Sequence, residues 1–332
     1  MSLPSQAGPR LLVTGSAGFI GSRLVQLLEG ERRYKLQGID RLPNGEMYCV
    51  DIRDTEELRR IAREFRPEIV VHLAALREVV TPWSEVGELF SINVQGTYSV
   101  LEALRPRLAI FASTSSVYGD GLPPRTMPQW DRIAPKSAYG ISKATGELTC
   151  DMWSRETGST AVVFRMGNLI GTVHGLLRYL LDHAQAFPSG SKPAQLRGDG
   201  VLVRDYIPLS HVLRSFSAAL NRDWGPGCHT INVASGIGIT NGEVFEVVRK
   251  ELQELGYQIN ARWSSTAAPY EAEAVALDPR SMLEQLGIAP PAREEIISAI
   301  RQSVRESMRP RTLRSIHLSA DSTIAVKTRE EL

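Results

Sequence analysis

A tyrosine and a lysine are the side chains in this sequence best suited to acid/base chemistry. Tyr139 and Lys143 are four residues apart, so on a helix both side chains lie on one face and can contact one ligand. A phenol has an ordinary pKa of about 10 and is therefore a poor base at neutral pH. A neighbouring ammonium favours the phenolate and lowers that pKa. The pair could thus remove a proton from an alcohol without a metal ion.

A tyrosine and a lysine at this spacing also occur on solvated helix faces, so the pair alone does not establish a catalytic site. A run of hydroxyl side chains strengthens the catalytic interpretation. Residues 113–116 read Ser-Thr-Ser-Ser and follow an apolar run that is typical of a buried strand. In a parallel open sheet the carboxyl ends of the strands line the crevice where ligands bind. We therefore expect Thr114 to hold the oxygen of the substrate while Tyr139 takes its proton.

A glycine-rich turn follows the first apolar run and has the spacing GxxGxxG. Such a turn cradles a pyrophosphate, and the amides of the helix that follows bind it. Asp40 ends the next apolar run 19 residues after Gly21, where a carboxylate can accept hydrogen bonds from a ribose. The turn predicts a dinucleotide site built from Gly15, Gly18, Phe19, Ile20 and Gly21.

The acid at position 40 predicts NAD as the cofactor, because a carboxylate repels the 2′-phosphate of NADP. Arg41 could pair with that phosphate, so NADP is disfavoured and not excluded. Asp51 and Ile52 follow a third short run and are expected near the adenine. The alternative for Asp51 is an exposed acid at a strand end.

The elements that must position these residues alternate between short apolar runs and amphipathic segments. The pattern predicts strands at 11–14, 35–40, 69–73, 108–113 and 160–165, and helices at 20–29, 55–65, 89–104 and 139–156. Continuous apolar strands separated by helices are typical of a parallel sheet buried on both faces. The fold class predicted is α/β, a Rossmann doubly wound parallel sheet with a smaller, mixed C-terminal substrate lobe.

The pattern becomes irregular after residue 165, and helices are predicted again at 241–255, 280–286 and 294–307. The proline- and glycine-containing stretch 188–193 is expected to be an exposed loop between the lobes. We predict a dinucleotide-binding domain of residues 8–168 with about 206–235, and a substrate lobe of about 169–205 with 236–308. Residues 309–332 are expected to be a poorly ordered tail.

The composition indicates a protein that acts on small molecules. The 332 residues carry a formal net charge of +1, which gives no basic surface for nucleic acid or a membrane. No apolar stretch is long enough to span a bilayer, and the amino terminus does not resemble a signal peptide. The three cysteines form no metal-site pattern, and we expect a cytoplasmic protein without a metal ion.

The chain resembles the extended short-chain dehydrogenase/reductase family, in its NAD-dependent sugar epimerase and dehydratase branch, as in enzymes similar to UDP-glucose 4-epimerase. The resemblance runs from about residue 11 to 286 and rests on TGSAGFIG at 14–21, VDIRD at 50–54, HLAA at 72–75, NVQGT at 93–97, SSVYG at 115–119, YGISK at 139–143, RMGNLIG at 165–171, GDGVLVRDYI at 198–207 and NVASG at 232–236.

The resemblance implies roles for individual residues. Tyr139 is the acid/base group, Lys143 binds the ribose and stabilises the phenolate, and Thr114 contacts the substrate hydroxyl. It adds cofactor contacts at Leu73, Ala74, Ala75 and Asn93, and substrate contacts at Ser115, Asn168 and Arg204, the last two toward a diphosphate. The alternatives are that Asn168 caps a turn and that Arg204 pairs only with Asp205.

The sequence departs from the family pattern on the substrate side. Family 4,6-dehydratases have an acid pair where this chain has Ser115 and Ser116, so dehydration is disfavoured. The family's HVxD motif is replaced by residues 208–211, and an arginine expected near 267–270 is absent, unless Arg262 or Arg280 reaches in. His174 in the altered stretch 172–176 could be a second acid/base group or a loop histidine.

These observations favour a nucleotide-sugar 4-epimerase that works through transient oxidation to a 4-keto intermediate. The first alternative is an NAD(P)-dependent reductase or dehydrogenase of a keto sugar nucleotide or another small carbonyl compound. The second is a non-catalytic nucleotide sensor, which would have no use for the Tyr139 and Lys143 pair. The resemblance also implies a homodimer formed through the helices at 89–104 and 139–156.

Overall fold

The computed structural model describes residues 8–42, 47–77, 81–120, 131–171, 175–265, 268 and 270–309. The predictions for His174, for most of 267–270 and for the tail beyond residue 309 fall outside these residues. No helix in the described part of the chain is long and apolar enough to cross a bilayer.

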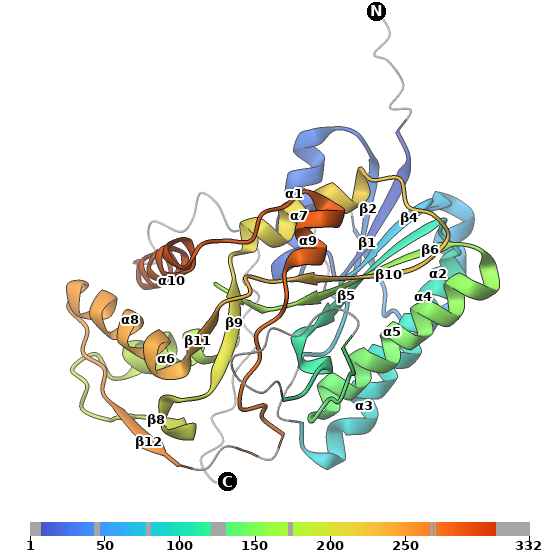
Figure 1. Cartoon of the computed structure of the whole chain (residues 1–332). Coiled ribbons are helices and arrows are strands. Elements are labelled where there is room, and N and C mark those ends of the chain that lie inside the picture. Colours follow the sequence, from blue (N-terminus) through green and yellow to red (C-terminus); the bar gives the residue numbers. More distant parts are fainter. Residues whose placement is uncertain are drawn as a thin grey trace, which may run out of the picture.

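A seven-stranded parallel sheet forms the larger part of the molecule (Figure 1). Its order is β10-β6-β5-β4-β1-β2-β3, so the chain runs outward from β1 in both directions. The strands are β1 (Arg10–Thr14), β2 (Lys35–Asp40), β3 (Tyr48–Cys49), β4 (Ile69–His72), β5 (Leu108–Thr114), β6 (Thr160–Met166) and β10 (Gly227–Val233). This order confirms the predicted Rossmann fold class.

Helices cover both faces of this sheet because alternate strand residues point to opposite sides. Leu11 and Val13 of β1 pack in the cluster that includes α1 (Phe19–Glu31), α7 (Leu209–Leu220) and α9 (Arg280–Leu286). Leu12 between them packs in the cluster on the other face, with α2 (Thr55–Phe65) and α4 (Gly96–Leu104). Next to these, α5 (Ala138–Thr157) covers β5 and β6.

A second, smaller group of elements stands beside the large sheet, at the left of Figure 1. It contains a three-stranded sheet, β11-β9-β7, and a two-stranded sheet, β12-β8. Its strands are β7 (Asn168–Leu169), β8 (Ala194–Arg197), β9 (Val203–Ile207), β11 (Gly238–Thr240) and β12 (Ala261–Ser264). Its helices are α6 (Gly175–Ala186), α8 (Asn241–Glu254) and α10 (Arg293–Met308), which share one apolar cluster.

Two predicted features differ in the structure. The loop at 188–193 joins α6 to β8, so it lies within the smaller group of elements and not between two lobes. The helix predicted at 89–104 starts earlier and is interrupted, because α3 (Val86–Phe90) is followed by a π-helical turn (Ser91–Gln95) before α4 begins. Short 3-10 turns lie at Trp83–Glu85, Ser115–Val117 and Gly198–Gly200.

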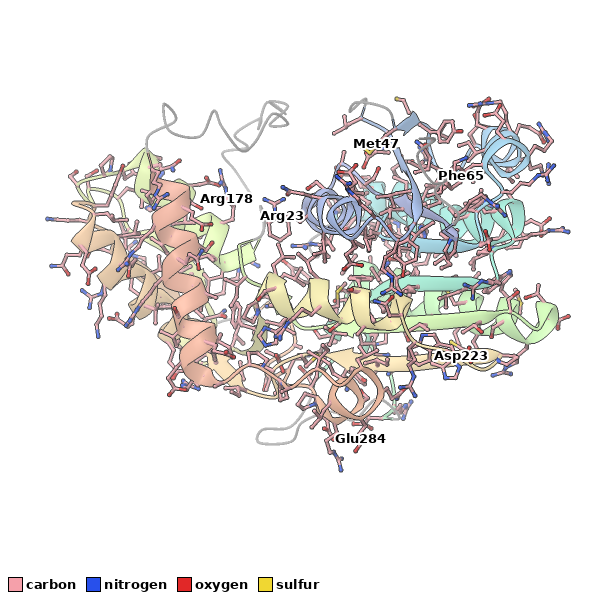
Figure 2. All side chains as sticks on the ribbon, turned by 90° about the horizontal axis from the view of Figure 1, so that it is seen from above. Arg23, Met47, Phe65, Arg178, Asp223 and Glu284 are labelled. Carbon is pink, nitrogen blue, oxygen red and sulfur yellow. The ribbon has the colours of Figure 1, made fainter. Side chains whose placement is uncertain are left out.

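The view from above separates the two groups of elements clearly (Figure 2). Arg178 of α6 lies in the smaller group, whereas Phe65 of α2 and Asp223 after α7 lie at the far end of the larger one. The carboxyl ends of β1, β2, β4 and β5 carry the glycine turn, Asp40, the 73–75 segment and Thr114. Because these four strands are parallel neighbours, the predicted residues meet at one edge of the sheet.

Candidate active site

The glycine turn after β1 is fixed by contacts that leave no room for side chains. Gly15 has a φ of +70° and donates its N–H to the Ile39 carbonyl at 2.9 Å. A Cβ added at Gly21 would lie 2.0 Å from the Gly15 carbonyl oxygen. The first turn of α1 therefore presses directly against the loop, as close packing of helix and strand requires.

The start of α1 presents unpaired amides. Gly18 is the N-cap and supplies no side-chain cap, and the first turn carries no acidic residue. The N–H groups of Phe19, Ile20 and Gly21 donate to no other described residue. Orphan amides and the positive end of a helix together suit a phosphate group.

Asp40 is held against this turn. Its Oδ2 accepts the Ala17 N–H at 3.0 Å and its Oδ1 accepts the Leu42 N–H at 3.2 Å. Each carboxylate oxygen can accept a further hydrogen bond, so the acid is oriented and still available to a ribose. Arg41 beside it is exposed.

The two residues predicted near the adenine differ in accessibility. Asp51 forms an ion pair with Arg53 at 2.7 Å, and a hydrogen bond from Arg53 lowers the pKa of the Asp51 carboxyl. Arg53 in turn pairs with Glu88 of α3 at 2.9 Å. Ile52 is buried against Gly96. The Asp51 charge is thus already compensated within the protein, and the Ile52 side chain belongs to the core.

A buried histidine joins the ends of β1 and β4. Thr97 Oγ1 donates to the Asn93 carbonyl and therefore accepts from His72 Nε2 at 3.0 Å. In a neutral ring Nδ1 then accepts from the Thr14 hydroxyl at 2.6 Å, and the same hydroxyl accepts the Ala74 N–H at 3.3 Å. Burial, with the charge of Lys143, lowers the pKa of His72 to about 3, so the ring is neutral.

The backbone at 73–75 runs alongside the glycine turn. Leu73 donates its N–H to the Thr14 carbonyl at 3.1 Å, and a Cβ added at Gly15 would lie 2.7 Å from the Ala74 nitrogen. Ala75 continues this stretch and is partly exposed. The structure therefore brings this segment and the glycine turn together, as a shared cofactor site requires.

Asn93 lies inside the π-helical turn and is almost fully buried. Its Oδ1 accepts the Leu76 N–H at 2.8 Å, and its Nδ2 donates to the Leu76 carbonyl at 2.9 Å and to Ser142 Oγ at 2.9 Å. Ser142 donates to the Tyr139 carbonyl at 2.8 Å. The amide of Asn93 is therefore occupied in bracing the loop after β4 against α5.

The predicted base lies at the start of α5 and next to the end of β5. Ser137 caps the helix by accepting the Gly140 N–H at 3.0 Å, and a Cβ at Gly140 would lie 2.7 Å from the Ser116 carbonyl oxygen. This close approach sets Tyr139 beside Thr114, whose hydroxyl donates to Ser116 Oγ at 3.3 Å. Burial raises the pKa of the Tyr139 phenol, while the charge of Arg77 and the nearby Thr114 hydroxyl oppose that rise.

Lys143 lies one turn further along α5 and is only 2% exposed. Its ammonium sits 4.0 Å from the centre of the Phe111 ring and forms no hydrogen bond or ion pair with another described residue. Burial lowers the pKa of Lys143 to about 8, and the charge of Glu147 opposes this. The lysine donors are thus free for a ligand.

A buried ion pair beneath Lys143 escaped the sequence reasoning. Glu147 accepts from Arg165 of β6 at 2.7 Å and from the Ser113 hydroxyl of β5. Ser113 and Arg165 are direct neighbours in the register of β5 and β6. The available signal was a glutamate one helical turn after Lys143, with a polar residue near the end of each strand below it.

Asp205, the aspartate of the RDYI segment, is a structural residue. It is buried and accepts four hydrogen bonds, from Ser235 N and Oγ at 2.8 and 2.7 Å, Gly236 N at 2.9 Å and Leu277 N at 3.1 Å. Burial raises the pKa of its carboxyl to about 6, and these donors limit the rise. The carboxyl is ionised at neutral pH and joins β9 to the 235–236 and 277 segments.

Arg204 and Tyr206 point to the other face of β9, so the alternative that Arg204 pairs with Asp205 is wrong. The guanidinium donates to the Val203 carbonyl at 2.8 Å, and burial lowers the pKa of Arg204. Among the described residues no carboxylate forms an ion pair with it. Asn168 lies within β7, in register opposite Tyr206, and therefore stands in a strand and not at a turn.

Arg262 and Arg280, which could replace the missing arginine near 267–270, have other surroundings. Arg280 is bound to Asp278 at 2.7 Å, and Arg262 is exposed on β12. Arg197 at the end of β8 instead donates to the Tyr270 hydroxyl at 3.0 Å. The charge of Glu271 acts on both Arg197 and Arg204, so these two arginines lie near one acid. Ser115 is buried in the 3-10 turn after Thr114.

These features define a class of protein. A parallel sheet in this order, with uncapped amides after a glycine turn and an acid at the end of β2, is a Rossmann-type dinucleotide-binding fold. The chain belongs to the NAD dependent epimerase/dehydratase family, whose model matches residues 11–234. Membership of this family supports an enzyme and confirms NAD as the cofactor predicted from the glycine turn.

Several proteins similar to this chain have the names of enzymes that act on nucleotide sugars. A dTDP-glucose 4,6-dehydratase of Neisseria meningitidis serogroup B is 28% identical over 74% of this chain and 76% of its own. A UDP-glucose 4-epimerase of Yersinia pestis is 29% identical over 83% of this chain and 91% of its own. The crystal structure of a UDP-glucose 4-epimerase of Thermotoga maritima with UDP-glucose has a TM-score of 0.79 at 27% identity, covering 90% of this chain and 100% of that one.

Proposed function

We propose that the protein is an NAD-dependent nucleotide-sugar 4-epimerase. The observation that carries this proposal is the buried Tyr139 phenol beside Thr114, which ends β5, with Lys143 one helical turn further along α5. The glycine turn that fits NAD stands two strands away at the same sheet edge. The similarity to two UDP-glucose 4-epimerases supports the choice of reaction and substrate.

The residues around the glycine turn fit the cofactor, because the turn offers free amides and leaves no space for a Cβ at Gly15 or Gly21. We assign Asp40 and Lys143 to its two riboses and the start of α1 to its pyrophosphate. When bound, NAD supplies a reversible two-electron acceptor.

The remaining chemistry falls to side chains of the protein. Tyr139 takes the proton of the sugar hydroxyl at its phenolic oxygen, and Thr114 holds the same substrate oxygen. The resulting 4-keto sugar rotates to present its other face, and Tyr139 then returns the proton to the new hydroxyl. Arg204 and Asn168, on the face of β9 and β7, are assigned to the diphosphate, since a half-buried guanidinium without a carboxylate partner favours an anion.

Elimination of water is disfavoured at this site. The residues directly after Thr114 are Ser115 and Ser116, whose hydroxyls are not acids at neutral pH. A dehydratase needs a group there that moves protons during water loss. This difference supports the epimerase over the dehydratase named among the relatives.

A keto-sugar reductase is the second candidate. It is favoured by the substrate side, where Ala268 stands in the segment expected to carry an arginine and neither Arg262 nor Arg280 takes its place. A reductase would change the net amount of reduced nicotinamide with each turnover, whereas an epimerase would not.

One experiment separates the two candidates. Purified protein is incubated with UDP-, dTDP- and GDP-hexoses, and product stereochemistry is followed together with the absorbance of reduced nicotinamide. We expect interconversion of 4-epimers without net reduction, and a loss of about a thousandfold in Tyr139→Phe. Tyr98→Phe, an exposed tyrosine on α4, is the control and should remain active. Net reduction with added cofactor would favour the reductase, and turnover of no hexose would contradict the epimerase.

We also propose that the protein is a homodimer in the cytoplasm. Ile141, Leu148 and Met152 share one face of α5 and are 43%, 61% and 54% exposed, and Tyr98 is exposed on the neighbouring α4. An exposed apolar face of this kind is typical of an interface. All three cysteines are free thiols, which fits a reducing compartment. Light scattering should give a monomer for Leu148→Asp and a dimer for Leu283→Asp on α9.

A further inference from the structure

We propose that Asp120, which ends the segment after β5, is a positioning residue that sets the distance between the Arg204 guanidinium and the Tyr139 phenol. Asp120 acts through hydrogen bonds of the backbone and not on the reacting atoms. The inference rests on the proposed function, in which Tyr139 works at the sugar and Arg204 holds the diphosphate. One substrate must then reach both side chains, so their separation decides whether it reacts.

The segment that ends in Asp120 is packed against the one that leads into α5. Gly119 has a φ of +72°, and a Cβ added there would lie 2.0 Å from the Ala134 carbonyl oxygen. The Ala134 N–H donates to the Val117 carbonyl at 2.9 Å. The Asp120 carboxylate also forms an ion pair with Lys136, which stands directly before the N-cap of α5. Asp120 is therefore fixed relative to the helix that carries the phenol.

The same carboxylate is bound to a segment that lies far along the chain, residues 270–277. The Glu273 N–H donates to Asp120 Oδ1 at 2.7 Å. Lys136 Nζ donates to the Glu271 carbonyl at 3.3 Å, so both members of the ion pair contact this segment. The segment also shares a buried apolar cluster with the residues beside Asp120 and with α5: Val117, Tyr118, Ala144, Ala234, Val275 and Leu277.

The backbone of Glu273 extends this contact to β9. Its carbonyl accepts the Val203 N–H at 2.9 Å, and the Val203 carbonyl in turn accepts the Val275 N–H at 3.0 Å. The Arg204 guanidinium donates to that same carbonyl at 2.8 Å. Three hydrogen bonds in series therefore lead from the Asp120 carboxylate, through two backbone residues, to the Arg204 guanidinium.

Asp120 contributes geometry more than stability. Burial alone would raise the pKa of its carboxyl, but the bonds from Lys136 and from the Glu273 N–H outweigh it and lower that pKa. The carboxylate is thus ionised at neutral pH, and an ionised acceptor binds a backbone N–H more strongly than a neutral one. The side chains of Asp120 and Lys136 are 40% and 34% exposed, and an ion pair of this kind adds little to the free energy of unfolding. We therefore expect removal of the carboxylate to displace the 270–277 segment and β9 without unfolding the protein.

The expected effect is a misplaced sugar. Binding of a free nucleoside diphosphate uses Arg204 and not Tyr139, so it does not depend on the separation between them. Reaction of a nucleotide sugar needs both side chains, and an error of about 1 Å in placement lowers a rate about a hundredfold. A variant of Asp120 should therefore lose kcat while its affinities for uridine diphosphate and for NAD stay as they are.

The first test follows the hydrogen bonds without any sugar. In the NAD-loaded protein, hydrogen–deuterium exchange is measured in peptides that cover residues 200–207 and 270–277. We expect Asp120→Ala to speed exchange in both peptides about tenfold, because the loss of one charge-assisted bond loosens the others in the series. Asp120→Asn should keep most of the protection, since its amide oxygen still accepts the Glu273 N–H.

The matched control is Asp182→Ala on α6, which removes a half-exposed carboxylate whose partner, Arg178, lies on the same helix. Exchange in both peptides should then be unchanged. Unchanged exchange of residues 200–207 in Asp120→Ala would overturn the inference, because the series would not reach β9. Faster exchange throughout the large sheet would also overturn it, since Asp120 would then stabilise the fold as a whole.

The second test measures placement through activity. Asp120→Ala should lower kcat for a pair of 4-epimers about a hundredfold, with calorimetric affinities for uridine diphosphate and NAD unchanged, and Asp120→Asn should retain most of the rate. An unchanged kcat in Asp120→Ala would overturn the inference, and so would an equal loss of affinity for uridine diphosphate. If the unsubstituted protein turns over no hexose, the epimerase assignment fails, and the exchange of residues 200–207 alone decides the role of Asp120.

Discussion

The cofactor side and the substrate side of this molecule are built in different ways. On the cofactor side the geometry belongs to the backbone: the glycine turn, the free amides of α1 and the strand ends lie in one continuous stretch of sheet and helix. On the proposed substrate side, Arg204, Asn168 and Arg197 come from three short strands, and their positions depend on which strands pair.

The difference concerns how each side responds to substitution. A backbone site is sensitive to any added atom, because the chain has no alternative path at Gly15 or Gly21. A site made of exposed or half-exposed side chains can exchange one charged residue for another while the strands stay in place. The cofactor would then be conserved while the substrate varies, and each prediction below tests one half of this comparison.

The largest effect is expected at Gly21. In Gly21→Ala the new methyl would meet the Gly15 carbonyl at 2.0 Å, so α1 must shift away from the turn. We expect the free energy of unfolding to fall by about 3 kcal/mol and NAD binding to be lost, as chemical denaturation and calorimetry would measure.

The same helix offers a matched control. A Cβ at Gly30 would meet nothing within 4 Å, so Gly30→Ala should stabilise the protein by up to about 1 kcal/mol through helix propensity. Normal NAD binding in Gly21→Ala would show that the backbone does not set the cofactor site.

Arg204→Met should affect only the substrate side. Removing a charge-assisted contact of about 2 kcal/mol should weaken binding of uridine diphosphate about 30-fold while NAD binding is unchanged. Calorimetric titration with each ligand would measure both. Arg262→Met, which alters the exposed arginine of β12, should leave both affinities as they are. Equal loss of NAD affinity in Arg204→Met would erase the distinction between the two sides.

The pH dependence tests a side chain that spans both halves. Burial holds the pKa of Lys143 near 8, so its positive charge is present below that pH and is lost as the pH rises through it. If the charge is required, kcat/KM should fall about tenfold for each pH unit above that value. A profile that stays flat to strongly alkaline pH would show that the Lys143 charge is dispensable.

The smallest effect is expected at Asp40. Asp40→Asn keeps an acceptor for the Ala17 N–H and removes the charge that repels a 2′-phosphate, a repulsion of about 1 kcal/mol when water fully screens the two charges. The preference for NAD over NADP should fall about fivefold, measured as the ratio of the two affinities. Asp54→Asn, at the N-cap of α2, is the control for a lost carboxylate. An unchanged ratio in Asp40→Asn would show that another residue sets the preference for NAD.

The sequence predicts the larger sheet well because buried parallel strands are continuous apolar runs. The ends of β1, β2, β4, β5 and β6 lie within about a residue of the predicted ones. Residues such as Thr114 and Tyr139 could be placed at one edge for the same reason. The strands β8 and β12 expose alternate residues, but they are too short for this alternation to identify a strand from the sequence.

Part of the site could not be predicted, because it depends on contacts between distant segments. Arg197 comes near the Tyr270 hydroxyl only because β12 pairs with β8. The hydrogen bonds of Asn93 depend on its position in the π-helical turn. Asp205 accepts from Ser235 and does not pair with Arg204, and this depends on where the chain places Ser235. No local spacing carries any of these three facts.

The place of β10 in the sheet has a consequence for the growing polypeptide. This strand pairs with β6 along its whole length, yet about sixty residues lie between the two in the chain, among them β7, α6, β8 and β9 of the smaller group and also α7. Until residue 233 has left the ribosome, β6 is an open edge with unpaired amides and carbonyls. A truncated chain that ends before residue 227 should therefore self-associate in a sedimentation experiment, and the smaller group of elements cannot be removed as a cassette.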